Sequence, residues 1–193
     1  MRTLIVATTL CLMVTWSTFS FAQCRAEENV DQVTMTTTIA VICQQTESEF
    51  VVFHCSGARD LLIGFFPSEY IGGDNSTVVL RGDAQTETHS FQGTVGNDGQ
   101  WFRAPSSSFI PVIEAFQSSD QVFIRYSDYR RVNHDFTVPA ANFTNASSQL
   151  ECVTSLMEAA ALREQMATDG EEIRAEMEAR GCEMRKEGWV CPE

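Results

Sequence analysis

Residues 50–66 restrict the possible folds more than any other part of this sequence. They contain two apolar runs, residues 50–55 and 60–66, with a short polar turn between them. Short runs rich in Val, Ile and Phe are typical of buried β-strands. The second run is apolar on both faces, which favours a central place in a sheet. We therefore expect two adjacent central strands, with Cys55 at the end of the first.

Other strands are expected before and after this pair. Residues 33–43 alternate with a period of two and are rich in β-branched side chains, which predicts an antiparallel hairpin with residues 50–55. Residues 97–99 are typical of a tight hairpin turn, and Trp101 and Phe102 then fall on opposite faces of a strand. The remaining strands are expected at residues 77–81, 89–95, 100–103, 122–126 and 135–138.

Helical spacing occurs in two places. In residues 106–117 the apolar side chains recur at helical spacing, and Pro111 fits the first turn, which predicts one short connecting helix. Near the C-terminus, Ser148 and Thr168 each stand three residues before a glutamate, the spacing of a capping box, so we expect two helical pieces. Gly181 is expected to end the second piece. The predicted fold class is mainly β: an antiparallel β-sandwich-like domain with one short connecting helix and a helical C-terminal segment.

The first residues have the pattern of a secretory signal peptide. Arg2 precedes an uncharged apolar run at residues 4–14, and residues 20–22 offer the small side chains that a signal peptidase reads. The run is too short to span a bilayer. We predict cleavage before Gln23, no stable membrane insertion afterwards, and a periplasmic or secreted location; a lipid anchor on Cys24 is the alternative. The expected segments are a signal peptide at residues 1–22, a β-rich domain at 23–156 and a helical, acidic C-terminal extension at 157–193.

Six cysteines remain once the signal peptide is removed. An even number of cysteines in an exported chain predicts disulfides, although the sequence alone does not choose among the many possible pairings. A bond between Cys43 and Cys55 is disfavoured, because they lie several residues apart along the ladder of the predicted hairpin. We favour one bond that closes a local loop, one that ties the central strands to the C-terminal helix, and one that fastens the mature N-terminus. These pairs are Cys182–Cys191, Cys55–Cys152 and Cys24–Cys43.

No catalytic, cofactor-binding or metal-binding residues are predicted. The three histidines, His54, His89 and His134, lie in no HExxH or similar motif, and no serine lies in a GxSxG motif. His54 and Cys55, like His134 and Asp135, are neighbours in predicted strands, so their side chains face apart. Zinc is disfavoured because the chain has no CxxC pair. A Ser-His-Asp arrangement assembled across the fold stays open as an alternative.

The charge of the chain limits its partners. It carries 26 acidic and 13 basic residues, a net charge of −13. Such a chain repels nucleic acid and anionic membranes, so we expect a protein partner and no nucleic acid. The acidic run at residues 171–178 is interpreted as a solvated helix face, with partner docking as the alternative.

Two short motifs are given no functional weight. Arg81, Gly82 and Asp83 spell a tripeptide that some adhesion receptors bind, but we interpret them as the end of a strand and the start of a turn. Asn75, Asn142 and Asn145 each begin an N-x-S/T sequence. They would be glycosylated on a eukaryotic secretory route, and are ordinary loop residues in a bacterium, which we favour.

The order of elements over residues 33–152 resembles the VasI-like family of exported accessory proteins of bacterial type VI secretion systems. The matching pieces are residues 50–55, 61–66, 81–83, Trp101, 109–116, 124–125, Phe136 and Cys152. The resemblance implies a periplasmic β-sandwich-like domain with an accessory, non-enzymatic role, and it supports the Cys55–Cys152 pairing. The chain departs from the pattern because it lacks a tryptophan before the first strand and adds Cys43 and the tail from Met157.

Residues and resemblance together predict an exported periplasmic accessory or binding protein without catalytic activity, associated with a type VI secretion system. The alternatives are a small secreted hydrolase and an exported inhibitor or ligand-binding module.

Overall fold

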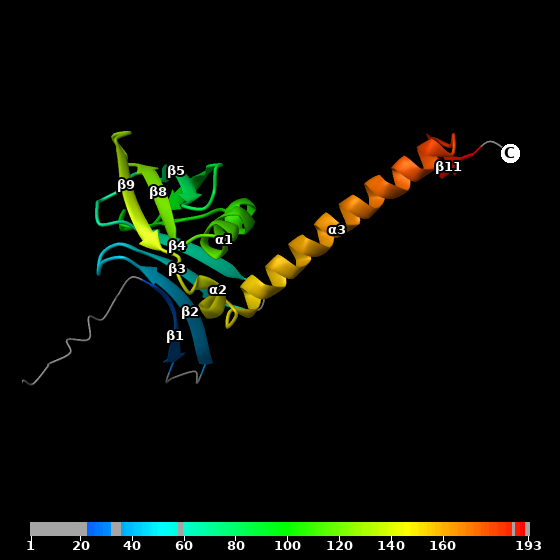
Figure 1. Ribbon diagram of the computed structural model, residues 1–193. Helices are drawn as coiled ribbons and strands as arrows, with labels where there is room; N and C mark the ends of the chain where they lie inside the picture. Colours follow the sequence, from blue (N-terminus) through cyan, green and yellow to red (C-terminus); the bar gives the residue numbers. More distant parts are fainter. Residues whose placement is uncertain (1–22, 32–35, 58–59, 187, 192–193) are drawn as a thin grey trace, which may run out of the picture.

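The chain folds into one large antiparallel sheet with helices at one side and a long helix that leaves the body (Figure 1). The computed structural model describes residues 23–31, 36–57, 60–186 and 188–191, so the expected signal peptide lies outside the described residues. The predicted mainly-β class with a helical C-terminal segment is confirmed. Within the described ranges, no helix is long and apolar enough to cross a bilayer.

The nine strands of the large sheet are ordered β1-β2-β3-β4-β7-β6-β5-β8-β9, and every neighbouring pair is antiparallel. The predicted central place of residues 50–66 is confirmed, because β4 pairs with β3 on one side and with β7 on the other. The strands are β1 (Gln23–Asp31), β2 (Thr36–Gln44), β3 (Phe50–Cys55), β4 (Leu61–Phe66), β5 (Asn75–Gly82), β6 (His89–Val95), β7 (Phe102–Arg103), β8 (Gln121–Ser127) and β9 (Asn133–Pro139).

The first strand was not expected from the sequence. β1 is mostly polar and charged, which is unlike a core strand but suits the edge of a sheet. It pairs with β2 along its whole length and places Cys24 opposite Cys43. The backbone amide of Cys24 also donates to the carbonyl of Ala141, 3.0 Å away and just beyond β9. The sheet is therefore bent so strongly that its first strand reaches the segment after its last.

The inner face of the sheet packs on two short helices. Phe53 in β3 is fully buried, and its ring lies 5.1 Å from that of Phe116 and 4.6 Å from that of Phe143. Phe116 belongs to α1 (Phe109–Gln117), which follows a 3-10 turn, η1 (Ser106–Ser108), and matches the predicted connecting helix. Phe143 belongs to α2 (Phe143–Ser147), a short helix that the sequence analysis missed.

All three favoured disulfides are confirmed. Cys24 bonds to Cys43, Cys55 to Cys152, and Cys182 to Cys191. The first joins directly opposed residues of β1 and β2, and the third closes the small hairpin of β10 (Glu183–Arg185) and β11 (Gly188–Val190). Disulfides persist in oxidising compartments, so this chain is expected to fold in one.

The two predicted C-terminal helical pieces are one continuous helix, α3 (Glu151–Ala179). Both capping boxes were wrong, because the hydroxyl of Ser148 donates to the carbonyl of Asn145 and that of Thr168 to the carbonyl of Glu164. A threonine that bonds back to the preceding turn can stay inside a helix. The predicted end of the helix is confirmed: Gly181 follows α3 with φ of +78°, in the left-handed region that favours glycine.

The bond between Cys55 and Cys152 should dominate the stability of the body, because it closes a loop of 97 residues in sequence separation. We expect the Cys55→Ala/Cys152→Ala variant to lose about 4–5 kcal/mol of unfolding free energy, measured by denaturant titration. The matched control is Cys182→Ala/Cys191→Ala. It removes a disulfide whose two cysteines are only nine residues apart in sequence, at the far end of α3. It should leave the unfolding of the body almost unchanged, and equal losses in the two variants would contradict the prediction.

Candidate functional site

The three histidines come from three different strands. His54 lies in β3, His89 at the start of β6 and His134 in β9. His89 is half-buried, its Nε2 atom has no hydrogen-bond partner in the described part of the chain, and burial lowers the pKa of its imidazole. His54 sits on the face of β3 opposite the core, next to a cysteine that is used in a disulfide. The fold therefore does not gather the histidines into one site.

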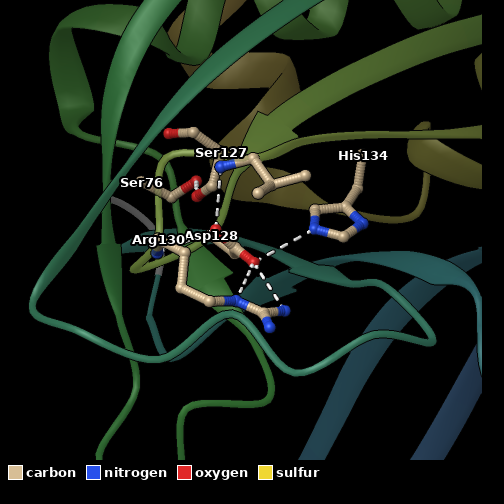
Figure 2. A network of polar contacts seen from close by, with 6 residues as sticks. Ser76, Ser127, Asp128, Arg130 and His134 are labelled. Atoms are coloured by element: carbon tan, nitrogen blue, oxygen red, sulfur yellow. Dashed lines mark hydrogen bonds and ion pairs between the residues drawn. The ribbon is translucent and has the colours of Figure 1, made fainter.

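His134 takes part in a buried polar network around Asp128, in the turn between β8 and β9 (Figure 2). The Asp128 side chain is fully buried, and its Oδ2 atom lies 3.3 Å from His134 Nε2 and 3.2 Å from the Arg130 guanidinium. Its Oδ1 atom accepts hydrogen bonds from the backbone amides of Arg130 and Val132 at 2.8 and 2.9 Å. One carboxylate thus fixes the whole turn.

These contacts outweigh the effect of burial on Asp128. Burial alone would raise the pKa of the carboxyl, but hydrogen bonds from Val132, His134 and Arg130 lower it to about 2. Bonds that favour the charged form act in this direction. Asp128 is therefore an ionised, structural group at neutral pH.

The network contains the residue types of a Ser-His-Asp triad without its geometry. The hydroxyl of Ser76 donates to the Ser127 carbonyl at 2.8 Å, and the hydroxyl of Ser127 accepts from the Thr77 amide at 3.1 Å. A nucleophilic serine would need a hydrogen bond with the imidazole. Within the described ranges, no serine hydroxyl makes that bond with His134.

The Arg-Gly-Asp tripeptide lies at the end of a strand, as predicted. Arg81 belongs to β5, and its guanidinium lies 5.9 Å from the ring centroid of Phe123 on the neighbouring strand. The carboxylate of Asp83 accepts a hydrogen bond from the amide of Asp120 at 3.0 Å. The two charged side chains are therefore engaged in separate contacts within the fold.

The three N-x-S/T asparagines have ordinary local positions. Asn75 begins β5, Asn142 precedes α2 in the left-handed region with φ of +67°, and Asn145 lies within α2. All three are exposed. All six cysteines expected in the exported chain are bonded in disulfides, and the described residues contain no cluster of three or more His, Cys, Asp or Glu suited to a metal ion.

The most site-like feature lies on the outer face of the sheet, where β3 begins and β4 ends. Phe50 and Phe66 are opposite each other in these strands, with ring centroids 4.5 Å apart, and Trp101 stacks on Phe66 at 5.7 Å. Tyr70, 59% exposed, adds a fourth ring. These aromatic side chains line a hollow of about 500 Å³, which we call the aromatic hollow. Its other lining residues are Ser48, Pro67, Ser68, Glu69, Asp98 and Gln100.

Close packing of loops holds the aromatic hollow in shape. The amide of Ile71 donates to the Gly99 carbonyl at 2.8 Å, and the amide of Tyr129 donates to the Ile71 carbonyl at 2.8 Å. Gly99 has φ of +69°, and a Cβ there would collide with the ring of Tyr70. Three loops are thus tied together, including the turn that Asp128 fixes.

The rim of the aromatic hollow is negatively charged. Glu69 and Asp98 are exposed lining residues, and neither forms an ion pair within the described residues. Carboxylates beside aromatic rings suit a cationic group, which gains from both the charge and the ring. Neutral serine and glutamine side chains complete the lining and can donate or accept hydrogen bonds.

A second hollow of about 370 Å³ lies across β5, β8 and β9. Its carboxylate is satisfied within the fold, because Arg125 donates to both oxygens of Asp135, at 2.7 and 2.8 Å, and its third charged side chain, Arg81, lies over the ring of Phe123. The ion pair raises the pKa of Arg125 and lowers the pKa of Asp135. The second hollow therefore offers a cation no carboxylate that lacks an ion pair, whereas Glu69 and Asp98 of the aromatic hollow form none within the described residues.

Sequence reasoning missed the aromatic hollow, although a signal was present. The alternation that puts Val51 and Phe53 in the core puts Phe50 on the opposite face of the sheet. A large aromatic side chain outside the core indicates a contact with other side chains on that face. Glu69 and Asp98 lie in loops, and no periodicity points to them.

No protein-family model, curated protein or solved structure matches this chain, so its function is inferred from this geometry.

The pH dependence of stability should report on Asp128. Its folded-state pKa of about 2 lies below the value near 3.8 of an unperturbed aspartate, so its contribution is present above about pH 4 and is lost as the pH falls toward 2. We expect Asp128→Asn to lower stability at pH 7 and to flatten the loss between pH 4 and 2, measured by denaturant titration. The exposed Asp135→Asn should change the profile less; an unchanged profile in Asp128→Asn would refute this role.

Proposed function

We propose that this chain is an exported binding protein without catalytic activity, which holds a basic segment of a protein partner in the aromatic hollow. The observation that carries the proposal is the row of stacked rings with two unpaired carboxylates on its rim. An arginine or lysine side chain can lie against Tyr70 while its charged group bonds Glu69 or Asp98.

The net charge of the chain supports a basic partner. At −13, the whole molecule attracts positively charged surfaces over a distance set by the salt concentration. Such a field raises the rate of encounter, and the short-range contacts then give specificity. The three disulfides fit an oxidising location, and we place the protein in the periplasm or outside the cell.

The resemblance to the VasI-like family supports a place in a type VI secretion system. It covers residues 33–152, which include all four rings of the aromatic hollow. Under this proposal the partner is a component or client of the secretion system that exposes a basic segment. The hydrolase alternative has no observation that favours it, because Ser76 and Ser127 bond to the backbone and not to an imidazole.

Trp101 provides a direct measurement of binding. The sequence has three tryptophans, of which Trp16 lies in the expected signal peptide, so Trp189→Phe leaves Trp101 as the reporter in the exported chain. We expect a short arginine-rich peptide to change its fluorescence saturably, and the matched glutamate-rich peptide to have no effect. Salt should weaken the binding.

Two variants test whether the carboxylates of the rim bind the arginine-rich peptide. Glu69→Gln/Asp98→Asn should weaken binding of the arginine-rich peptide at least about tenfold, because two charged contacts are lost. The matched control, Glu164→Gln/Glu171→Gln, removes the same charge from exposed positions of α3 and should bind like the wild type. No saturable change, or equal binding in the two variants, would overturn the proposal.

The secretion-system role has its own test in the source bacterium. Deleting the gene should reduce type VI-dependent secretion of an effector, and the wild-type gene should restore it. We expect the Glu69→Gln/Asp98→Asn gene to fail and the Glu164→Gln/Glu171→Gln gene to succeed. Secretion that is unaffected by the deletion would remove the type VI role while leaving the binding proposal to its own measurement.

A further inference from the structure

Most of α3 makes no contact with the body. Only Cys152 and Val153 are buried, and every residue from 161 to 176 is exposed. Figure 1 shows α3 running away from the sheet, with β10 and β11 at its far end. Three large apolar side chains of this helix lie in solvent: Leu162 is 59%, Met166 65% and Ile173 56% exposed. A surface helix normally packs its large apolar side chains against the protein core.

The three exposed large apolar residues lie on one line along α3 with Gly170 and the half-buried Met177. At about 100° per residue, five positions fall within an arc of about 80°. We call this line the apolar stripe; it consists of Leu162, Met166, Gly170, Ile173 and Met177. The small Gly170 has no atom within 4 Å of a Cβ position, so a second backbone can approach the middle of the stripe closely.

The two sides of the apolar stripe carry opposite charges. The same helical geometry puts Arg163 and Arg174 on one side, and Asp169, Glu172 and Glu176 on the other. Of these, Glu176 bonds Arg180 of its own helix at 2.6 Å, while the arginines Arg163 and Arg174 form no ion pair within the described part of the chain. The stripe thus has a basic flank with free cations and an acidic flank.

This arrangement is complementary to a second copy of itself in parallel. When two identical helices lie parallel around a two-fold axis, the basic flank of each faces the acidic flank of the other. Asp169 then lies near Arg174 of the second copy, the five-residue offset that directs pairing in parallel coiled coils. In an antiparallel pair like flanks meet, and Arg163 would approach Arg174 of the second copy. The charges therefore select the parallel orientation.

The tip of the chain favours the same orientation. The disulfide-closed hairpin of β10 and β11 exposes 60% of Met184 and 45% of Val190. Parallel helices bring the two tips together, where these side chains can cover one another, whereas antiparallel helices separate them. We infer that α3 is a dimerisation arm, whose apolar stripe packs in parallel against the stripe of a second copy of this chain.

The mass of the full exported chain in sedimentation equilibrium tests the inference. We expect a concentration-dependent dimer, which Ile173→Glu weakens at least about tenfold by placing a charge in the contact. The matched control, Ala175→Glu, adds the same charge on the opposite side of α3 and should dimerise like the wild type. Both sites are exposed, so both variants should keep the thermal unfolding of the wild-type body. A monomer at all concentrations, or a dimer that Ile173→Glu leaves intact, would overturn the dimer.

A charge exchange tests the orientation. Asp169→Arg and Arg174→Glu should each weaken the dimer, since each places like charges together across the parallel pair. The double variant Asp169→Arg/Arg174→Glu restores opposite charges and should recover most of the affinity. A double variant that is as weak as the two single ones would rule out the parallel arrangement.

Discussion

The disulfide between Cys55 and Cys152 is the constraint on which the arrangement of the molecule depends. It joins the last residue of β3 to the first turn of α3, two elements that are far apart in sequence. The first turns of α3 also bury Cys152 and Val153 and pack the half-buried Leu156 and Met157 against the core, so the disulfide and this packing together set the point from which the helix leaves the body. The same strand carries Phe53, whose contacts with α1 and α2 fix the other two helices. One strand thus contacts all three of the helices α1, α2 and α3.

The two faces of β3 contribute to different parts of the molecule. Alternation sends Val51 and Phe53 into the core, where they are fully buried, and leaves Phe50 on the outer face. Phe50 cannot join the core without a change of register that would expose the buried side chains. It stacks instead on Phe66 of β4 and forms part of the aromatic hollow. The core that stabilises the fold therefore also fixes where the aromatic surface must be.

Sequence reasoning predicted the parts of this fold that depend on local patterns. The strands β3 and β6, the helix α1 and the presence of disulfides follow from apolar periodicity, turn residues and cysteine number, and the three favoured pairs are the ones that form. It failed for β1, because an edge strand needs only backbone partners and its side chains carry no apolar pattern. It also failed at Ser148 and Thr168, where the capping-box spacing is present but the hydroxyls bond to carbonyls of earlier residues.

The candidate site was harder to predict for a physical reason. Tyr70 and Trp101 line the same hollow because the amides of Ile71 and Gly72 donate to the carbonyl of Gly99, and these bonds join loops that are not neighbours in sequence. Charges in such loops follow no periodicity, so Glu69 and Asp98 gain meaning only from the rings beside them. The apolar stripe of α3 is different, because helical spacing alone defines it. It escaped notice because Gly170 and the surrounding charges dilute the apolar signal along the helix.

The two proposed surfaces have a consequence when they are combined. A parallel pair of α3 helices places both bodies at the same end of the dimer, so each dimer presents two aromatic hollows. A partner with repeated basic segments can then engage both, and the second contact forms at a high effective concentration. Each hollow alone can bind weakly, as expected for an exposed cation site, and the dimer still holds the partner firmly. The long helix acts here through geometry, since it fixes how many binding surfaces act together without contacting the ligand itself.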